Sequence, residues 1–252
     1  MSSFLALSPK DCQAYTWRVP TTLSFAQHRA LIPVHAGELS HAAASMPLAL
    51  WQQDDKWQLV AVCGLQAEHN LFIKDGQWLG HYRPNWLQTY PFDLMPVGDK
   101  AYPVMDRSSP LLVNGLEGEA FFDAKGQLTA AVAQRIAVLQ SCFARSKITQ
   151  SAIAALLQHQ LLTPWPESLT QPLGQKIQGL HLVDEKALHQ LSDAAFLALR
   201  EAMALPLAYA LNFSLAQNHL LARLQKINPP AAPTLDVEQM LNFGSDTLKF
   251  DF

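Results

Sequence analysis

The first half of the chain is organised around Leu48-Ala49-Leu50-Trp51-Gln52-Gln53-Asp54-Asp55-Lys56-Trp57-Gln58-Leu59-Val60-Ala61-Val62-Cys63. Residues 48–51 and 57–63 are rich in aliphatic and aromatic residues, which is typical of β-strands. Asp54-Asp55-Lys56 lies between them and has the composition of a tight turn. We therefore expect two consecutive strands joined by a short connection.

Shorter elements are predicted on either side of this pair. Residues 70–73 resemble a third strand, and the following Lys74-Asp75-Gly76-Gln77 carries the Asp-Gly signal of a hairpin turn. A short helix is expected from Glu38 to Ser45, just before Pro47. Residues 84–118 contain five prolines, which favours edge strands and turns over helix.

The second half has helical periodicity. Val132, Ile136, Leu139 and Phe143 recur at spacings of four, three and four, which places them on one helical face. Thr149 is predicted to cap a second helix that continues through Leu161.

Capping residues mark the later helices. Asp184 is predicted to begin one short helix, and Ser192 or Asp193 the next. Pro206 is expected to kink or break a buried apolar helix before Tyr209.

These patterns predict an α+β protein. A β-rich N-terminal part with antiparallel strands, residues 1–127, is expected to pack on a mainly helical part, residues 128–228, around one shared core. The tail, residues 229–252, contains Phe243, Phe250 and Phe252 and is interpreted either as a strap on the same chain or as a partner-binding peptide.

Composition excludes several classes of function. The 252 residues include 18 Lys and Arg and 21 Asp and Glu, for a net charge of −3, so we expect no nucleic-acid binding through a basic surface. No apolar run is long enough for membrane insertion, and the N-terminus lacks the pattern of a secretory signal. Cys12, Cys63 and Cys142 are odd in number and far apart, so they are interpreted as buried thiols of a cytoplasmic protein.

One segment has the composition of a recognition site. Trp78, Tyr82, Arg83, Trp86 and Tyr90 lie within thirteen positions and are the candidate ligand- or partner-binding residues. Arginine binds carboxylates through two parallel hydrogen bonds, and Trp or Tyr offers a flat amphipathic surface. The alternative is that the tryptophans belong to the core and that Arg83 is only solvated.

The sequence contains no strong catalytic or cofactor motif. It lacks the Gly-x-Ser-x-Gly, Walker A, Gly-x-Gly-x-x-Gly and Cys-x-x-Cys patterns, so no catalytic residue and no cofactor is predicted. His35, Glu38 and His41 form a weak metal candidate, because a helix would place Glu38 and His41 on one face. The alternative is that they are ordinary surface or capping residues.

Several segments together resemble the SapC family of bacterial proteins, from about Leu31 to Leu224. The family's C-terminal elements resemble residues 179–188, 191–192 and 197–200, and His81 departs from the small or apolar residue expected at its position. The N-terminal resemblance rests on Asn70-Leu71-Phe72-Ile73-Lys74-Asp75-Gly76-Gln77-Trp78, Tyr82-Arg83-Pro84, Tyr90-Pro91-Phe92 and Glu119-Ala120-Phe121-Phe122-Asp123-Ala124-Lys125-Gly126.

The resemblance implies a cytoplasmic accessory or binding protein that works with a small-molecule or peptide uptake or modification system. Its partner would be a protein, or its ligand a small molecule or peptide, and we expect no catalysis of its own. One alternative is a metal-dependent enzyme acting on an amino acid, peptide or sugar-like substrate. A second alternative is a structural protein associated with a surface layer. The resemblance supplies no catalytic residue, and the oligomeric state stays open.

Overall fold

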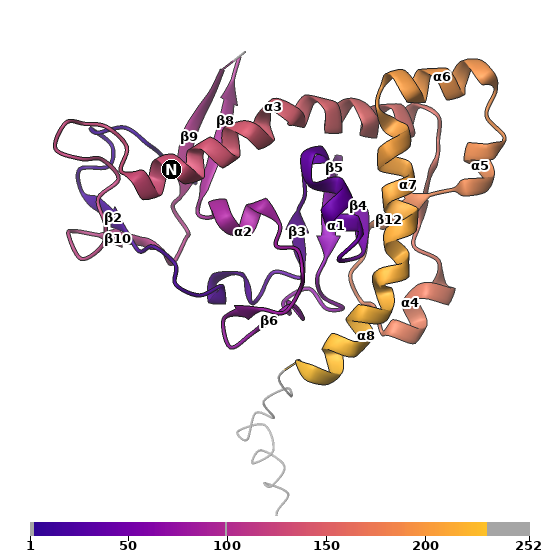
Figure 1. Ribbon diagram of the computed structural model, residues 1–252, viewed down its shortest axis with the longest axis horizontal. Helices are drawn as coiled ribbons and strands as arrows, with labels where there is room; N and C mark the ends of the chain where they lie inside the picture. Colours follow the sequence, from indigo (N-terminus) through magenta and orange to yellow (C-terminus); the bar gives the residue numbers. More distant parts are fainter. Residues whose placement is uncertain (1–2, 99, 231–252) are drawn as a thin grey trace, which may run out of the picture.

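A single long helix connects two sheet regions in the computed structural model, which describes residues 3–98 and 100–230 (Figure 1). This helix, α3 (Ala130–Gln158), crosses the molecule from the smaller sheets to the helices of the C-terminal half. The antiparallel sheets of the first half and the helices of the second confirm the α+β prediction.

The larger sheet has five antiparallel strands in the order β11-β12-β4-β5-β3. The predicted pair β4 (Leu48–Gln53) and β5 (Lys56–Val62) lies near its centre, joined through Asp54 at a positive φ of 52°. Strands β11 and β12 come from the second half of the chain and were not predicted, because each is only three or four residues long. The remaining strands are β3 (Leu31–Pro33), β11 (Leu162–Pro164) and β12 (Leu180–Val183).

The three-stranded sheet and the β2–β10 pair lie near the start of α3, away from the five-stranded sheet, whereas β6 lies below β3 in Figure 1. A three-stranded sheet has the order β1-β9-β8, and β10 pairs with β2. The predicted Asp-Gly hairpin is confirmed, because Asp75 and Gly76 join β6 to β7 with φ values of 52° and 74°. These strands are β1 (Phe4–Ala6), β2 (Tyr15–Trp17), β6 (Ile73–Lys74), β7 (Gln77–Trp78), β8 (Phe92–Val97), β9 (Lys100–Asp106) and β10 (Leu112–Asn114).

The helices follow several of the predicted signals. The helix expected at 38–45 is present as α1 (Leu39–Ala43), preceded by the 3₁₀ turn η2 (Ala36–Glu38). Asp184 and Ser192 cap α5 and α6 through hydrogen bonds to backbone amides, as predicted. The other elements are η1 (Ser24–Ala26), α4 (Glu167–Leu173), α5 (Glu185–His189), α6 (Asp193–Glu201), α7 (Ala204–Ser214), η3 (Leu215–Gln217) and α8 (Asn218–Ile227).

Four local predictions were wrong. Only Ile73 of the strand expected at 70–73 lies in a strand, because Leu71 and Phe72 form a turn in which Asn70 Oδ1 accepts the Phe72 amide at 3.0 Å. Residues 85–89 form a short helix, α2 (Asn85–Thr89), which fits between Pro84 and Pro91 so that neither proline interrupts it. Thr149 does not begin a helix: it is buried within α3, where its hydroxyl accepts a hydrogen bond from the Ala36 amide at 3.1 Å. The break near Pro206 falls earlier, at Met203, which has a left-handed backbone, and Pro206 lies in the first turn of α7.

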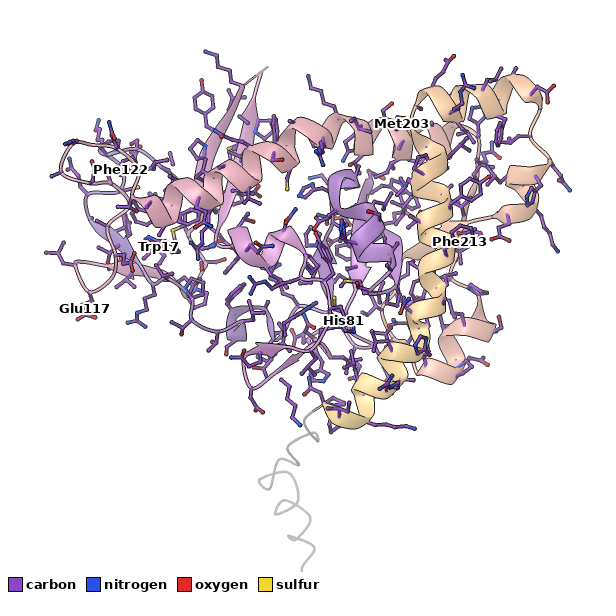
Figure 2. The ribbon with its side chains drawn as sticks, in the orientation of Figure 1. Trp17, His81, Glu117, Phe122, Met203 and Phe213 are labelled. Carbon is purple, nitrogen blue, oxygen red and sulfur yellow. The ribbon has the colours of Figure 1, made fainter. Side chains whose placement is uncertain are left out.

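The smaller of two hydrophobic clusters surrounds Trp17, which is fully buried (Figure 2). Val132, Ile136 and Leu139 from the first half of α3 pack into this cluster. The Trp17 ring meets Phe92 edge-on, with 4.9 Å between ring centroids. Ala152, Ile153 and Leu156, from the second half of α3, instead belong to the other cluster.

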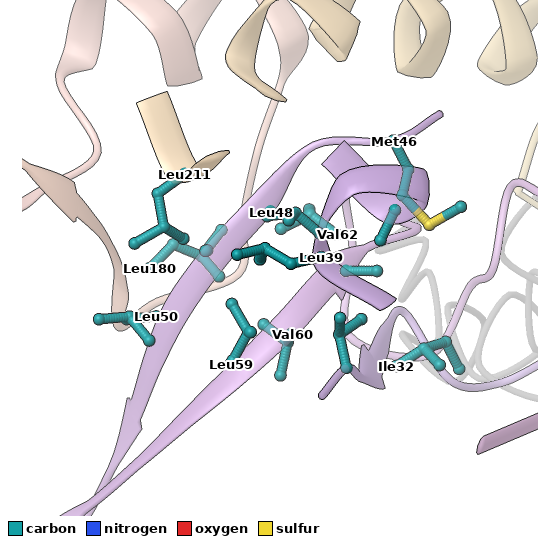
Figure 3. Packing of buried hydrophobic residues seen from close by; sticks show 14 of the residues in the cluster. Ile32, Leu39, Met46, Leu48, Leu50, Leu59, Val60, Val62, Leu180 and Leu211 are labelled. Carbon is teal, nitrogen blue, oxygen red and sulfur yellow. The ribbon is translucent and has the colours of Figure 1, made fainter. Parts of the chain in front are cut away.

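The larger cluster fills the space between the five-stranded sheet, α1 and α7 (Figure 3). Leu48, Leu50, Val60 and Val62 contribute from the sheet, and Leu211 contributes from α7. This cluster therefore contains apolar residues from both halves of the chain.

No single helix within residues 3–98 and 100–230 is long and apolar enough to cross a membrane. The segments Asp193–Glu201 and Ala204–Ile227 reach the required length and hydropathy only as a pair, bent by 90° at their junction. The predicted contacts of Phe243, Phe250 and Phe252 lie outside the described residues.

Candidate functional site

The predicted recognition residues lie in four different surroundings. Trp78 packs inward: its ring stacks on Phe72 with 5.0 Å between centroids, and its Nε1 donates a hydrogen bond to the Tyr82 carbonyl at 2.8 Å. This contact holds the segment that follows the β6–β7 hairpin. The neighbouring His81 is exposed (Figure 2).

Tyr82 links the predicted aromatic cluster to the predicted metal candidate. Its hydroxyl donates a hydrogen bond to Glu38 Oε2 at 2.6 Å, and the His41 ring stacks on its ring at 5.6 Å. Burial, followed by the hydrogen bond to Glu38, raises the pKa of the Tyr82 phenol. The two groups of residues proposed separately from sequence therefore meet at one carboxylate.

Glu38 is buried, with 2% of its surface exposed, and its oxygens are already engaged. Oε1 accepts the His35 amide at 3.0 Å, and Oε2 also accepts the Asn85 amide at 2.9 Å. Asn85 in turn donates to Cys142 Sγ at 3.6 Å. In the part of the chain that the structure describes, no group of three or more His, Cys, Asp or Glu side chains is placed to hold a metal ion.

Trp86 and Tyr90 form an aromatic group with Phe25. Phe25 and Tyr90 are stacked with 4.7 Å between centroids, and Trp86 lies 5.0 Å from Tyr90. The basic residue over these rings is Arg29, whose guanidinium carbon lies 5.0 Å from the Trp86 centroid. Phe25 and Arg29 were not predicted, because nothing in the local pattern of residues 25–29 indicates a contact with α2.

Arg83 points to a different place, a cleft between the start of α2 and α3. This arginine cleft has a volume of about 190 Å³ and is lined by Arg83, Gln88, Gln134 and Arg135 together with Pro20, Leu23, Leu87 and Val138. Its two arginines come from segments that are far apart in sequence. Arg135 was missed because it follows the periodicity of an ordinary helix surface.

An apolar groove lies at the opposite end of α3. Two adjoining cavities, of about 270 and 640 Å³, share Ala36, Leu39 and Pro206 in their walls. Met203, the residue before α7, and Phe213, near the end of α7, are 53% and 70% exposed (Figure 2). We call this surface the apolar groove, and its other walls include Arg145, Ile148, Thr149, Tyr209 and Gln217.

The sequence pattern predicted α7 as a buried apolar helix and did not reveal its exposed side. Leu207 and Leu211 are buried in the larger cluster, as that prediction requires, while Tyr209 and Phe213 stack on each other at the surface with 6.0 Å between centroids. Apolar residues occur all around the helix, so periodicity does not show which side stays uncovered.

Comparison with known proteins identifies the family. The SapC family model matches residues 7–221 of the 252, a range that includes both the arginine cleft and the walls of the apolar groove. No curated protein and no solved structure matches the chain. Because one family model covers most of its length, this chain belongs to the SapC family.

Proposed function

We propose that this SapC-family chain is a binding protein without catalysis of its own, and that its apolar groove takes an apolar helix of a protein partner. The groove carries this proposal, because an uncovered apolar surface of this kind marks an interaction site in proteins. The accessory role in a small-molecule or peptide uptake or modification system is the expectation that the family resemblance supplies. Three buried unpaired thiols support a reducing, cytoplasmic setting.

The dimensions of the groove favour a helix as its occupant. Its walls follow α7 and η3 from Met203 to Gln217, and at a rise of about 1.5 Å per residue this corresponds to roughly 20 Å. A partner helix of about four turns matches this length and would place residues at spacings of three and four against Met203 and Phe213. The surrounding walls come from α1, α3 and α7, so the partner would complete a group of packed helices.

Charge further specifies the partner. Arg145 is the sole charged residue among the described walls of the groove, and it lies at the α3 side. Within the described residues its guanidinium makes one hydrogen bond, a long one of 3.5 Å to the Gly37 carbonyl. A partner helix with an apolar face and an acidic residue near one end is complementary to this arrangement.

The site around Glu38 supports binding over catalysis. A carboxylate that already accepts hydrogen bonds from Tyr82, His35 and Asn85 has a structural task, because it joins η2 to the segment that contains α2.

A labelled model peptide tests this function on the full chain. The probe is a fourteen-residue amphipathic helix with leucines along one face and one terminal glutamate, compared with a scrambled peptide of the same composition by fluorescence anisotropy. We expect the helical probe to bind the parent protein. Phe213→Ser should weaken this binding about tenfold or more, since the substitution removes an apolar anchor from the interface. Leu116→Ser is the matched control, because Leu116 is 89% exposed and lies outside the groove.

A charge exchange tests the role of Arg145. Arg145→Glu should reverse the preference between probes that end in glutamate and probes that end in lysine. Equal binding of the scrambled peptide, or no effect of Phe213→Ser, would overturn the proposal. A dimer in analytical ultracentrifugation that Phe213→Ser dissociates would assign the groove to a second copy of the chain. Probe binding that appears only after Phe243, Phe250 and Phe252 are changed to serine would assign it to the chain's own C-terminal segment.

A further inference from the structure

We propose that the arginine cleft is a second and independent binding site, and that it takes a small organic carboxylate. Its position is separate from the apolar groove, since the two surfaces share no wall residue and lie toward opposite ends of α3.

Neither arginine forms an ion pair within the described residues, although Glu119 lies near enough to Arg135 to act on its charge. Within the described residues Arg83 is exposed and makes no hydrogen bond or ion pair. Arg135 is half-buried and uses Nη1 to donate to the Ala131 carbonyl at 2.9 Å, one helical turn earlier. Two cations that share one cleft repel each other, and a bound anion relieves that repulsion.

The Arg135 side chain packs on the ring of Trp17. Its guanidinium carbon lies 4.9 Å from the centre of the Trp17 ring, and Trp17 is fully buried. Burial lowers the pKa of Arg135, and nearby Glu119 acts in the opposite direction. The guanidinium nevertheless stays charged in proteins, so a fixed cation lies in a partly desolvated place, where it attracts an anion more strongly than in water.

Hydrogen-bond donors in the cleft remain available. In the part of the chain that the structure describes, the Arg83 guanidinium and Nη2 of Arg135 have no acceptor, whereas Nε of Arg135 is buried and out of reach of a ligand. The fork of N–H groups on a guanidinium fits the two oxygens of a carboxylate. Gln88 and Gln134 add amide groups at the same walls.

The remaining walls indicate an organic ligand of small size. Leu87 and Val138 offer apolar surface for a carbon skeleton, which an inorganic anion would not need. The volume of about 190 Å³ is below the range of roughly 300–1,000 Å³ for pockets that hold drug-sized ligands. These features favour an acid of about the size of an amino acid.

Titration calorimetry on the full chain at low ionic strength tests the proposal with three probes: glutarate, its neutral diamide and inorganic phosphate. Low salt is chosen because screening weakens attraction at an exposed arginine. We expect glutarate to bind with one-to-one stoichiometry, and the diamide and phosphate to bind at least tenfold more weakly. Glutarate that binds no more tightly than the diamide or phosphate, or that gives no binding at all, would overturn the carboxylate assignment.

Variants connect the signal to the cleft. Arg83→Gln should weaken the binding of glutarate at least tenfold. Arg83→Lys should also weaken this binding, because lysine keeps the charge but loses the paired donors. Arg223→Gln is the matched control, since Arg223 is exposed on α8 and outside the cleft. Arg135→Gln removes a residue that packs on Trp17, so Arg83→Gln, whose side chain is exposed, is the decisive variant. Unchanged glutarate binding in Arg83→Gln would overturn the site.

Discussion

The Tyr82 hydroxyl donates to the buried Glu38 carboxylate with 2.6 Å between the two oxygens, and this bond joins positions 44 residues apart in the sequence. Glu38 belongs to η2, and Tyr82 lies between the β6–β7 hairpin and α2. Because Glu38 also accepts the His35 and Asn85 amides, one carboxylate joins the turn around η2 to the segment that contains Tyr82 and α2.

Tyr82→Phe removes one donor from this carboxylate. A hydrogen bond to a charged group contributes about 1.5–3 kcal/mol, and the partial exposure of Tyr82 places the expected loss near the lower end of that range. Urea unfolding of the two proteins measures the difference. Tyr209→Phe is the control, because Tyr209 is 42% exposed and its hydroxyl makes no hydrogen bond to the described residues, so the free energy of unfolding of this variant should be nearly unchanged. A similar loss in both variants would contradict the special role of Tyr82.

Alkaline pH should destabilise the folded protein through Tyr82. Burial and the bond to Glu38 raise the pKa of this phenol, so the folded state retains a proton that the unfolded chain loses near its ordinary pKa of about 10. The contribution of Tyr82 to the free energy of unfolding is complete below about pH 10 and is lost as the pH rises above that value. Urea unfolding between about pH 9 and pH 11 should show a steeper decline for the parent than for Tyr82→Phe. Parallel declines would refute the assignment.

The three thiols should react slowly in the native protein. Cys12, Cys63 and Cys142 are all free and buried, and burial raises the pKa of each, so the reactive thiolate is scarce and poorly accessible. Labelling with monobromobimane should be slow in buffer and should reach three thiols per chain in urea. Ser40→Cys adds an exposed thiol as a reference for rapid labelling. Cys63 is fully buried, so native labelling of Cys63 as fast as this reference would contradict its placement.

Ser214→Ala should weaken the attachment of α7 to the sheet. The buried Ser214 hydroxyl accepts the Leu48 amide at 2.9 Å and donates to the Leu211 carbonyl at 2.7 Å. Removing it leaves a buried N–H without an acceptor, which costs about 1–3 kcal/mol of the free energy of unfolding. Ser151→Ala, at an exposed position of α3, is the control and should change stability little. Thermal and urea unfolding provide the measurement, and equal stability of both variants would show that the Leu48 amide finds another acceptor.

Short-range signals predicted the elements that depend on their own residues. The hairpin turn at Asp75-Gly76 needs two positive φ values, and the caps at Asp184 and Ser192 bond amides two or three residues away. These interactions are local, so the sequence shows them directly. The single helix α3 was instead predicted as two, because its buried face belongs to the smaller cluster at Ile136 and to the larger one at Ile153.

The candidate sites were predicted only in part for the same reason. Arg83 was named from its aromatic neighbours, but its partner across the cleft is Arg135, and the residue over Trp86 is Arg29. The apolar groove was not predicted, because the apolar composition of α7 is compatible both with a fully buried helix and with a helix that has one uncovered side.

The sequence alone determined the α+β class, the main hairpin, the helix caps and the SapC resemblance, since each depends on spacing and residue type over short distances. Only the tertiary structure decided that Glu38 meets Tyr82, that Arg135 faces the cleft of Arg83, and that Met203 and Phe213 stay exposed along α7. These relationships connect distant segments, and they are set by which faces pack together and which are left without a partner.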